Sequence, residues 1–367
     1  MSTTQRSTTQ CQNNTPPSSF SNPLTPPPTD EKRFARVHRI LKLFENIRAG
    51  QHSSQQAEID FQLTDGDYLE IRRRLDEDDE LSRFVENKIR YDYNGETYHL
   101  VVRMPTGVHE LFIDGVEDAI RSQLKVIRRG SGSEAEFARK VRPARSTEIE
   151  VPVENAPSSR KSKYEPDASF WHEDAQYPGV IIEVAYSQKK KRLDRLARDY
   201  ILGSDASVRV VVGLDIEYSR NELRKATLSV WRPQLLQGSD GPELDAVKEV
   251  VDKEFRDENG NPTGHPGLKL RLSDFACEEL TRGAVSGEGQ EITLSTRELC
   301  QYLAAAEEKT RGKRALVKHT IPLGVKKRKR SETPQEKIAS DDEARYVELE
   351  ERAAKRIADK DLDYEDS

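Results

Sequence analysis

The chain has 367 residues, of which 34% are apolar and 34% are charged. An ordinary globular domain is richer in apolar residues and poorer in charged ones, so this composition predicts a folded core with solvated tails. No run approaches the roughly 20 apolar residues that span a bilayer, and the first residues lack an apolar signal core. We therefore expect neither a membrane protein nor a secreted one.

Three scattered cysteines, Cys11, Cys277 and Cys300, form no CxxC pair, which argues against a disulfide scaffold or a cysteine-rich zinc site. The formal net charge is −6, and residues 336–367 alone hold 12 acids and 6 bases, so the rest of the chain is neutral. The overall charge thus neither supports nor opposes a nucleic-acid surface on the folded part.

The chain before residue 58 is expected to consist of a disordered tail, a helix with one apolar face and a linker. Residues 1–28 are mostly Ser, Thr, Gln, Asn and Pro and cannot bury enough surface to offset the entropy of ordering, which predicts a disordered tail. Residues 29–57 are expected to form a helix, capped by Thr29 or Asp30 and ended by Gly50, followed by a linker.

Residues 58–235 combine helical and strand periodicity, which predicts an α/β domain. A helix is expected from Thr64, with a break near the acidic run at 76–80, and then a hairpin whose turn is Asn94-Gly95. The remaining elements are predicted, in order, to be a helix over 108–124, a polar loop over 129–145, strands over 148–153, 164–171 and 179–186, a helix over 193–201, and strands over 208–218 and 225–231.

The rest of the chain is expected to be less regular. Residues 236–310 are predicted to form a partly ordered extension, with short strands over 268–272 and 292–294 and a helix from Ser295. Residues 311–335 are a basic linker, and residues 336–367 are expected to be an acidic helical tail.

Two acids stand out in the predicted strands. Asp167 follows Pro166, and Glu183 lies in the apolar run 180–185, where a carboxylate is unfavourable without a compensating partner. A divalent cation such as Mg²⁺ would compensate both acids if adjacent strands bring them together. A structural ion pair with a lysine or an arginine would do the same. Glu110, in the first turn of the 108–124 helix, is favoured there by the helix dipole alone.

These residues also resemble the motifs of a known family. The sequences Pro166-Asp167 and Glu183-Val184-Ala185-Tyr186-Ser187, preceded by Met104-Pro105 and by His109 at a helix start, resemble the PD-(D/E)XK superfamily of restriction-endonuclease-like proteins. Within it, the chain looks closest to the Uma-type restriction endonucleases and to a related group of uncharacterised fungal proteins, over roughly residues 60–235.

The resemblance implies a central mixed sheet flanked by helices and Mg²⁺-assisted phosphodiester hydrolysis, with Mn²⁺ as an alternative ion. It implies that Asp167 and Glu183 are metal ligands and that Glu110 is an outer catalytic acid. The family places a lysine two residues after the second acid, where this chain has Ala185. Lys189, near the start of the next helix, is the candidate catalytic replacement. Other candidates for this role are Gln188, Lys190 and Lys191.

Basic residues around the predicted 129–145 loop are candidates for contacting the phosphates of DNA or RNA, although such a run is also typical of a solvated face. These bases are Arg121, Lys125, Arg128, Arg129, Arg139, Lys140, Arg142 and Arg145. The dense basic run Lys326-Lys327-Arg328-Lys329-Arg330 predicts binding to a nuclear import receptor and a nuclear location, with a cytoplasmic location as the alternative.

The sequence therefore supports two classes of function. The first is a nuclear, nuclease-like protein that hydrolyses or binds nucleic acid with the help of Mg²⁺. The second is a catalytically inactive protein of the same fold that serves as a protein-interaction scaffold, a reading that Ala185 favours.

Overall fold

A computed structural model of the chain describes residues 34–52, 58–154, 156, 160–186, 190–217, 224–239, 241–286, 290–310, 321 and 325. By its internal contacts the chain divides into a unit from Met1 to Arg314 and a second from Ala315 to Ser367, and every element below belongs to the first. The tail expected over 1–28, the run Lys326–Arg330 and the helix expected over 336–367 lie outside the described residues.

Three helices form the N-terminal part of the first unit: α2 (Ala35–Arg48), α3 (Asp67–Asp76) and α4 (Asp79–Lys88). Asp78 begins α4 by accepting a hydrogen bond from the backbone N–H of Leu81 at 2.9 Å. Helix α2 and the break between α3 and α4 confirm those predictions, but the cap predicted at Thr29 or Asp30 is wrong: the N-cap of α2 is Phe34, which makes no side-chain cap.

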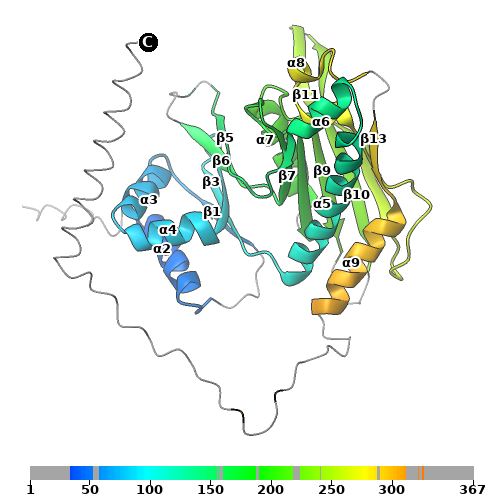
Figure 1. Cartoon of the computed structure of the whole chain (residues 1–367). Helices are drawn as coiled ribbons and strands as arrows, with labels where there is room; N and C mark the ends of the chain where they lie inside the picture. The colour runs from blue at the N-terminus through cyan, green and yellow to red at the C-terminus, as the bar shows by residue number, and fades with distance from the viewer. Residues whose placement is uncertain are drawn as a thin grey trace, which may run out of the picture. The chain divides into compact units, whose positions relative to one another are not determined.

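A five-stranded antiparallel sheet packs against these helices, which Figure 1 draws in blue and cyan. Its strands, in spatial order, are β1 (Glu58–Gln62), β3 (His99–Arg103), β2 (Arg90–Asn94), β6 (Lys161–Tyr164) and β5 (Ile149–Pro152). The sequence pattern does not predict β1, because two apolar residues in five are too few to define a period.

The hairpin of β2 and β3 is present, but the two-residue turn predicted at Asn94-Gly95 is wrong. Asn94 pairs directly with His99, so four residues connect the strands. The Asn94 side chain accepts hydrogen bonds from the backbone N–H groups of Glu96 and Thr97, at 3.0 and 2.8 Å. This local bonding closes a longer loop than Asn-Gly alone suggests.

A six-stranded mixed sheet lies beyond the first. Its strands, in spatial order, are β11 (Gly241–Arg256), β10 (Ala226–Gly238), β9 (Val210–Ile216), β8 (Val180–Tyr186), β7 (Ala168–His172) and β4 (Val141–Pro143). Strands β8 and β9 are parallel and are joined by the crossover helix α7 (Lys190–Gly203), whereas the other neighbours are antiparallel.

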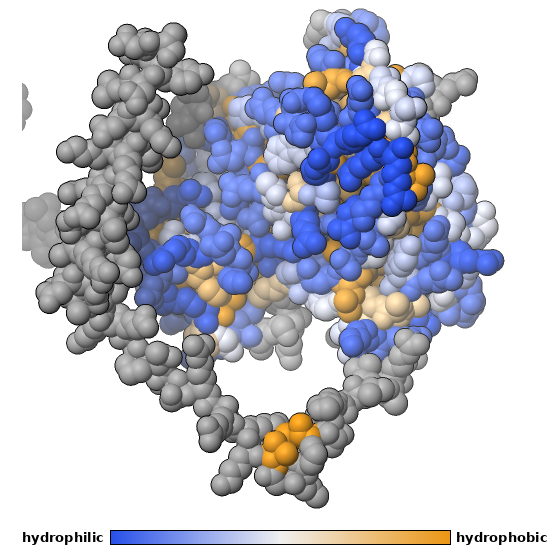
Figure 2. Space-filling model, in the orientation of Figure 1, coloured by the Kyte–Doolittle hydropathy of each residue, from blue (hydrophilic) through white to orange (hydrophobic). Residues whose placement is uncertain are grey.

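Helices cover both faces of this second sheet (Figure 1). Helices α5 (Gly107–Arg128), α6 (Ser133–Lys140) and α9 (Thr296–Thr310) bury apolar side chains against one face, and α7 does so against the other. The predicted helices at 108–124, at 193–201 and from Ser295 are thereby confirmed. Figure 2 shows the most hydrophilic colour of this view over α6 and the C-terminal half of α5.

The loop predicted over 129–145 is wrong. The segment contains α6 and β4, because Ala135, Phe137 and Ala138 supply a buried apolar face that the surrounding charges mask in the sequence. Further along, β11 and α9 contribute Phe255, Leu299 and other side chains to the same buried cluster as α5.

Short elements complete the fold. Strands β12 (Leu268–Arg271) and β13 (Glu291–Leu294) confirm the two short strands predicted there, and η2 (Leu272–Phe275) and α8 (Glu278–Thr281) lie between them. The described chain is thus α/β, with mixed and antiparallel sheets flanked by helices. None of the helices described here is long and apolar enough to cross a bilayer.

Candidate functional site

Asp167 lies where the chain passes from one sheet to the other. The stretch 164–171, predicted as one strand, is instead two: β6 ends at Tyr164 in the five-stranded sheet, and β7 begins at Ala168 in the six-stranded sheet. Pro166 has no backbone N–H for a strand ladder, which favours a break at this position. Asp167 is consequently buried at the junction of the two sheets.

Glu183 lies within β8, the neighbour of β7, and is also buried. Both carboxylates reach one nitrogen atom of Arg103, the last residue of β3. Nη1 of Arg103 lies 3.2 Å from Oδ1 of Asp167 and 3.2 Å from Oε2 of Glu183. The structure thus brings the two acids together, and an arginine occupies the point at which they meet.

The remaining oxygens of the two acids also accept hydrogen bonds. Oδ2 of Asp167 accepts from the backbone N–H of Val184 at 2.8 Å and lies 3.0 Å from Nε2 of His109 on α5. Oε1 of Glu183 accepts from the hydroxyl of Tyr200 on α7 at 2.7 Å. Every carboxylate oxygen of the pair therefore has a donor within the protein.

The other side of the Arg103 guanidinium faces Asp92 on β2. Nη2 of Arg103 lies 3.3 Å from Oδ1 of Asp92, and Nη2 of Arg192 on α7 lies 2.6 Å from Oδ2 of the same carboxylate. Arg192 also pairs with Glu58 on β1. We call these connected charges the ionic cluster; its members are Glu58, Asp92, Arg103, His109, Asp167, Glu183 and Arg192.

Burial and charge shift the pKa values within the ionic cluster. Burial and the charge of Asp167 raise the pKa of Glu183 to about 8, against the lowering effect of Arg103. Burial would also raise the pKa of Asp167, but the cations His109 and Arg103 hold it well below its ordinary value. Burial would lower the pKa of His109, but the Asp167 carboxylate raises it to about 9. At neutral pH His109 is therefore a cation and Asp167 an anion.

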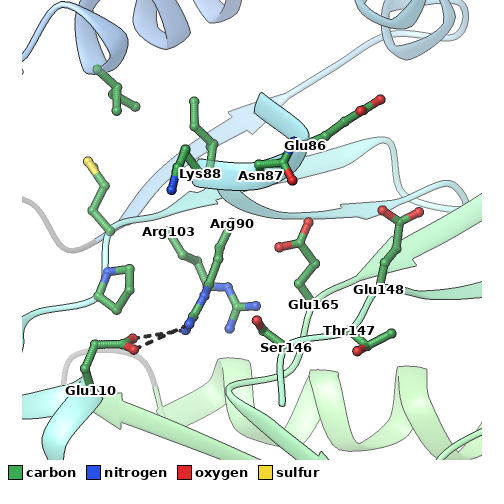
Figure 3. A pocket seen from close by; sticks show the side chains of 14 residues that line it. Glu86, Asn87, Lys88, Arg90, Arg103, Glu110, Ser146, Thr147, Glu148 and Glu165 are labelled. Carbon is green, nitrogen blue, oxygen red and sulfur yellow. Dashed lines mark hydrogen bonds and ion pairs between the residues drawn. The ribbon is translucent and has the colours of Figure 1, made fainter. Parts of the chain in front are cut away.

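Glu110 lies on the open side of the cluster. Its carboxylate pairs with Arg90 at 3.1 Å and lies 3.4 Å from Nδ1 of His109. Arg90, Arg103 and Glu110 line a cavity of about 570 Å³, whose wall does not include Asp167 or Glu183. Figure 3 shows the side chains of Arg90 and Arg103 side by side in this cavity, with Glu110 joined to Arg90.

This arrangement does not fit a divalent cation. Mg²⁺ takes oxygen ligands at about 2.1 Å in near-octahedral geometry. The point between Asp167 and Glu183 holds a nitrogen of Arg103 instead, and their other oxygens accept from N–H and O–H groups. Among the residues that the structure describes, no three or more His, Cys, Asp and Glu side chains are grouped to hold a metal ion.

The structure does not describe the side chains of the residues that were candidates for the missing lysine. Lys189 and Gln188 lie outside the described residues, as do the side chains of Lys190 and Lys191. Ala185 stands where the proteins that the sequence resembles have a lysine, and it pairs with Asp215 of β9 in the parallel ladder.

The bases expected around a loop lie on α5, α6 and β4 or in the turns beside them. Arg128, Arg139 and Arg142, which we call the arginine cluster, each donate to backbone carbonyl groups of this segment, as Arg139 does to Arg128 at 3.1 Å. In the described part of the chain none of the three forms an ion pair with an acid. Three neighbouring bases do form such pairs: Arg121, Lys140 and Arg145.

Sequence reasoning missed several members of the ionic cluster, chiefly Asp92, Arg103 and Arg192. A signal was present for two of them. Asp92 lies between two tyrosines and Arg103 follows three apolar residues, so each is a charge in an otherwise apolar strand, as Glu183 is. Since a buried charge requires a partner of opposite charge, the base Arg103 could have been predicted to pair with the acids Asp92 and Glu183.

No protein-family model and no curated protein matches the sequence. The geometry of the site and of the surface is therefore the basis for a functional assignment.

Proposed function

We propose that this chain is a nucleic-acid-binding protein with a PD-(D/E)XK-like, restriction-endonuclease-like domain, and that it holds phosphates on the surface formed by α5, α6 and β4. The observation that carries the proposal is the arginine cluster. Burial lowers the pKa of Arg128, and the like charge of Arg142 lowers it further, which indicates that the guanidinium groups of Arg128 and Arg142 repel each other. A bound polyanion would relieve that repulsion.

The geometry of the cluster suits phosphate. Each guanidinium is held by backbone carbonyl groups, which occupy some of its five N–H donors and leave others for a ligand. Holding the planar group in place before binding reduces the entropy lost when it binds, and guanidinium N–H pairs match phosphate oxygens well. Arg139 and Arg142 are exposed, and Figure 2 shows the hydrophilic surface over α6.

The distance along α5 between the cavity and the arginine cluster sets a minimum length for a duplex that contacts both. Glu110, at the cavity, and Arg128, in the arginine cluster, lie 18 residues apart on one helix, which corresponds to about 27 Å at 1.5 Å per residue. A duplex that touches both places must therefore be at least about 8 base pairs long, at about 3.4 Å per pair.

Fluorescence anisotropy with labelled DNA and RNA duplexes of about 20 base pairs tests the proposal. The double variant Arg139→Gln/Arg142→Gln should bind at least about tenfold more weakly than the wild type. The slope of log K against the logarithm of the salt concentration should also decrease in magnitude by about 2, since each lost phosphate contact contributes about 0.9 to that slope. The control Arg83→Gln/Arg282→Gln removes the same charge from exposed positions on α4 and beside α8.

Equal loss of affinity in both double variants would contradict the assignment to the arginine cluster, and absence of binding in the wild type would contradict nucleic-acid binding altogether. Cleavage of the probe in the presence of Mg²⁺ would show hydrolysis, and DNA and RNA probes run side by side identify the preferred nucleic acid. Each of these outcomes is read from the same samples.

A second candidate function is protein interaction, as in an inactive nuclease-fold scaffold. It is favoured by a two-stranded arm, because β10 pairs with β9 only as far as Trp231 and then continues paired with β11. Leu235 and Leu236 on this arm are exposed by 71% and 40%. If the arm joins two copies, Leu235→Glu/Leu236→Glu should lower the sedimentation coefficient and leave nucleic-acid affinity unchanged.

A further inference from the structure

We propose that the guanidinium of Arg103 occupies the place of a divalent metal ion between Asp167 and Glu183, and that it prevents such ions from binding to these two acids. The inference goes beyond nucleic-acid binding and does not depend on it. It concerns what the retained acid pair does in this chain.

The first argument is the position of the guanidinium. Its Nη1 lies at the meeting point of Asp167 and Glu183, and its Nη2 reaches Asp92, so three carboxylates from three chain segments surround one cation. Burial and the charge of Asp167 raise the pKa of Glu183 even with Arg103 beside it, so the two acids would resist ionising together still more if no cation lay between them. Arg103 supplies that cation from within the fold, and an ion entering the same place would have to displace it.

The second argument is access. The wall of the 570 Å³ cavity includes Arg103 together with Glu86, Glu110, Glu148 and Glu165, but neither Asp167 nor Glu183, so an ion that enters the cavity faces the guanidinium of Arg103 and not the acid pair. Arg103 is itself only 7% exposed. Moving it aside would leave three buried carboxylates without their common partner, which is a strongly destabilising change.

The third argument is mechanical. Arg103 belongs to the five-stranded sheet, and Glu183 belongs to the six-stranded sheet. Their contact therefore joins the two sheets where the chain crosses between them at Asp167. The acid pair thus has a structural role that requires no metal. Both acids can stabilise the junction of the two sheets although Ala185 stands where a catalytic lysine is expected.

Isothermal titration of Mn²⁺ and Mg²⁺ into the full chain tests the inference. The wild type should show no binding that depends on Asp167, and neither ion nor a chelator should shift its thermal midpoint. Arg103→Met should acquire a site for Mn²⁺, at least about tenfold tighter than any wild-type binding, because it removes the cation that bridges the oxygens of Asp167 and Glu183. The double variant Arg103→Met/Asp167→Asn should lose the acquired site.

Arg256→Met is the matched control, because it removes an equally buried guanidinium whose one acidic partner in the described part of the chain is Glu307, and it leaves Arg103 in place. It should acquire no ion site. A folded Arg103→Met that binds no better than the wild type would overturn the inference, as would wild-type binding that Asp167→Asn abolishes. If Arg103→Met does not fold by circular dichroism, the wild-type titration with its Asp167→Asn partner decides alone. No nucleic acid is present, so these results are separate from the test of the proposed function.

Discussion

The imidazole of His109 and the carboxylate of Asp167 lie 3.0 Å apart, which joins the first turn of α5 to the junction of the two sheets. His109 is buried, and its other ring nitrogen faces Glu110. A buried histidine between two carboxylates is stabilised as the imidazolium, so this contact makes the stability of the fold depend on pH.

Stability should decrease as the pH rises above neutrality. Asp167 raises the pKa of His109 from an ordinary 6.5 to about 9, so the folded chain binds this proton more tightly than the unfolded chain does. The resulting stabilisation is fully present below about pH 6.5, is lost as the pH rises through about 9, and amounts to at most about 3 kcal/mol. The raised pKa of Glu183 acts in the same direction, between its unfolded pKa and about 8.

Urea unfolding at a series of pH values measures this dependence. His109→Gln should remove a large part of the decrease in unfolding free energy between about pH 6.5 and 9. If the variant shows the same decrease as the wild type, His109 is not the responsible group.

Tyr200→Phe should destabilise the fold by about 1–2 kcal/mol. The substitution removes the hydroxyl that donates to Oε1 of Glu183 at 2.7 Å and leaves the ring volume almost unchanged, so a buried carboxylate oxygen loses its donor. Chemical denaturation provides the measurement. Tyr302→Phe is the control, because Tyr302 is only half-buried and makes no hydrogen bond in the described part of the chain, and its change should stay below about 0.5 kcal/mol.

Glu307→Gln, on α9, should lower the free energy of unfolding. The Glu307 carboxylate lies 2.7 Å from Arg224 and 2.9 Å from Arg256, and Arg256 is 1% exposed. Removing the negative charge leaves a buried guanidinium without its counter-charge, so we expect a loss of about 3 kcal/mol in unfolding free energy. Glu308→Gln, at an exposed position on the same helix, should have little effect, and equal losses in both variants would exclude this explanation.

Gly179→Ala should destabilise the fold by about 1–3 kcal/mol or more. A Cβ atom at Gly179 would lie 2.3 Å from the backbone carbon of Phe275, so the start of β8 and η2 would have to separate. At Gly264, a Cβ atom would meet nothing within 4 Å, so Gly264→Ala should be nearly neutral. Thermal unfolding compares the two variants, and a neutral Gly179→Ala would show that this close approach can relax.

Replacing the five bases Lys326–Arg330 by glutamine should redistribute the protein in cells. The run is a candidate for recognition by a nuclear import receptor, which requires a dense positive charge. A fluorescent fusion of the full chain should be nuclear, and the variant should be mainly cytoplasmic. A wild-type fusion that stays in the cytoplasm would contradict the nuclear prediction.

Local pattern predicted most of the regular elements. The periodic apolar residues of α5 and α7, and the continuous apolar run of β9, carry their signal in neighbouring residues. The failures have the same origin. At α6 the charges outnumber the apolar residues, and at residues 164–171 two short strands follow each other with no gap in strand-like composition, although they belong to different sheets.

The sequence by itself determined the helix and strand content of most of the chain and singled out Asp167 and Glu183 as acids that require compensation, because propensity and hydrophobic period are properties of adjacent residues. Only the tertiary structure decided what compensates them. Arg103 is 64 residues from Asp167 and 80 residues from Glu183 along the chain. A buried charge attracts whichever opposite charge the fold brings within a few ångströms, and that choice depends on how the two sheets meet.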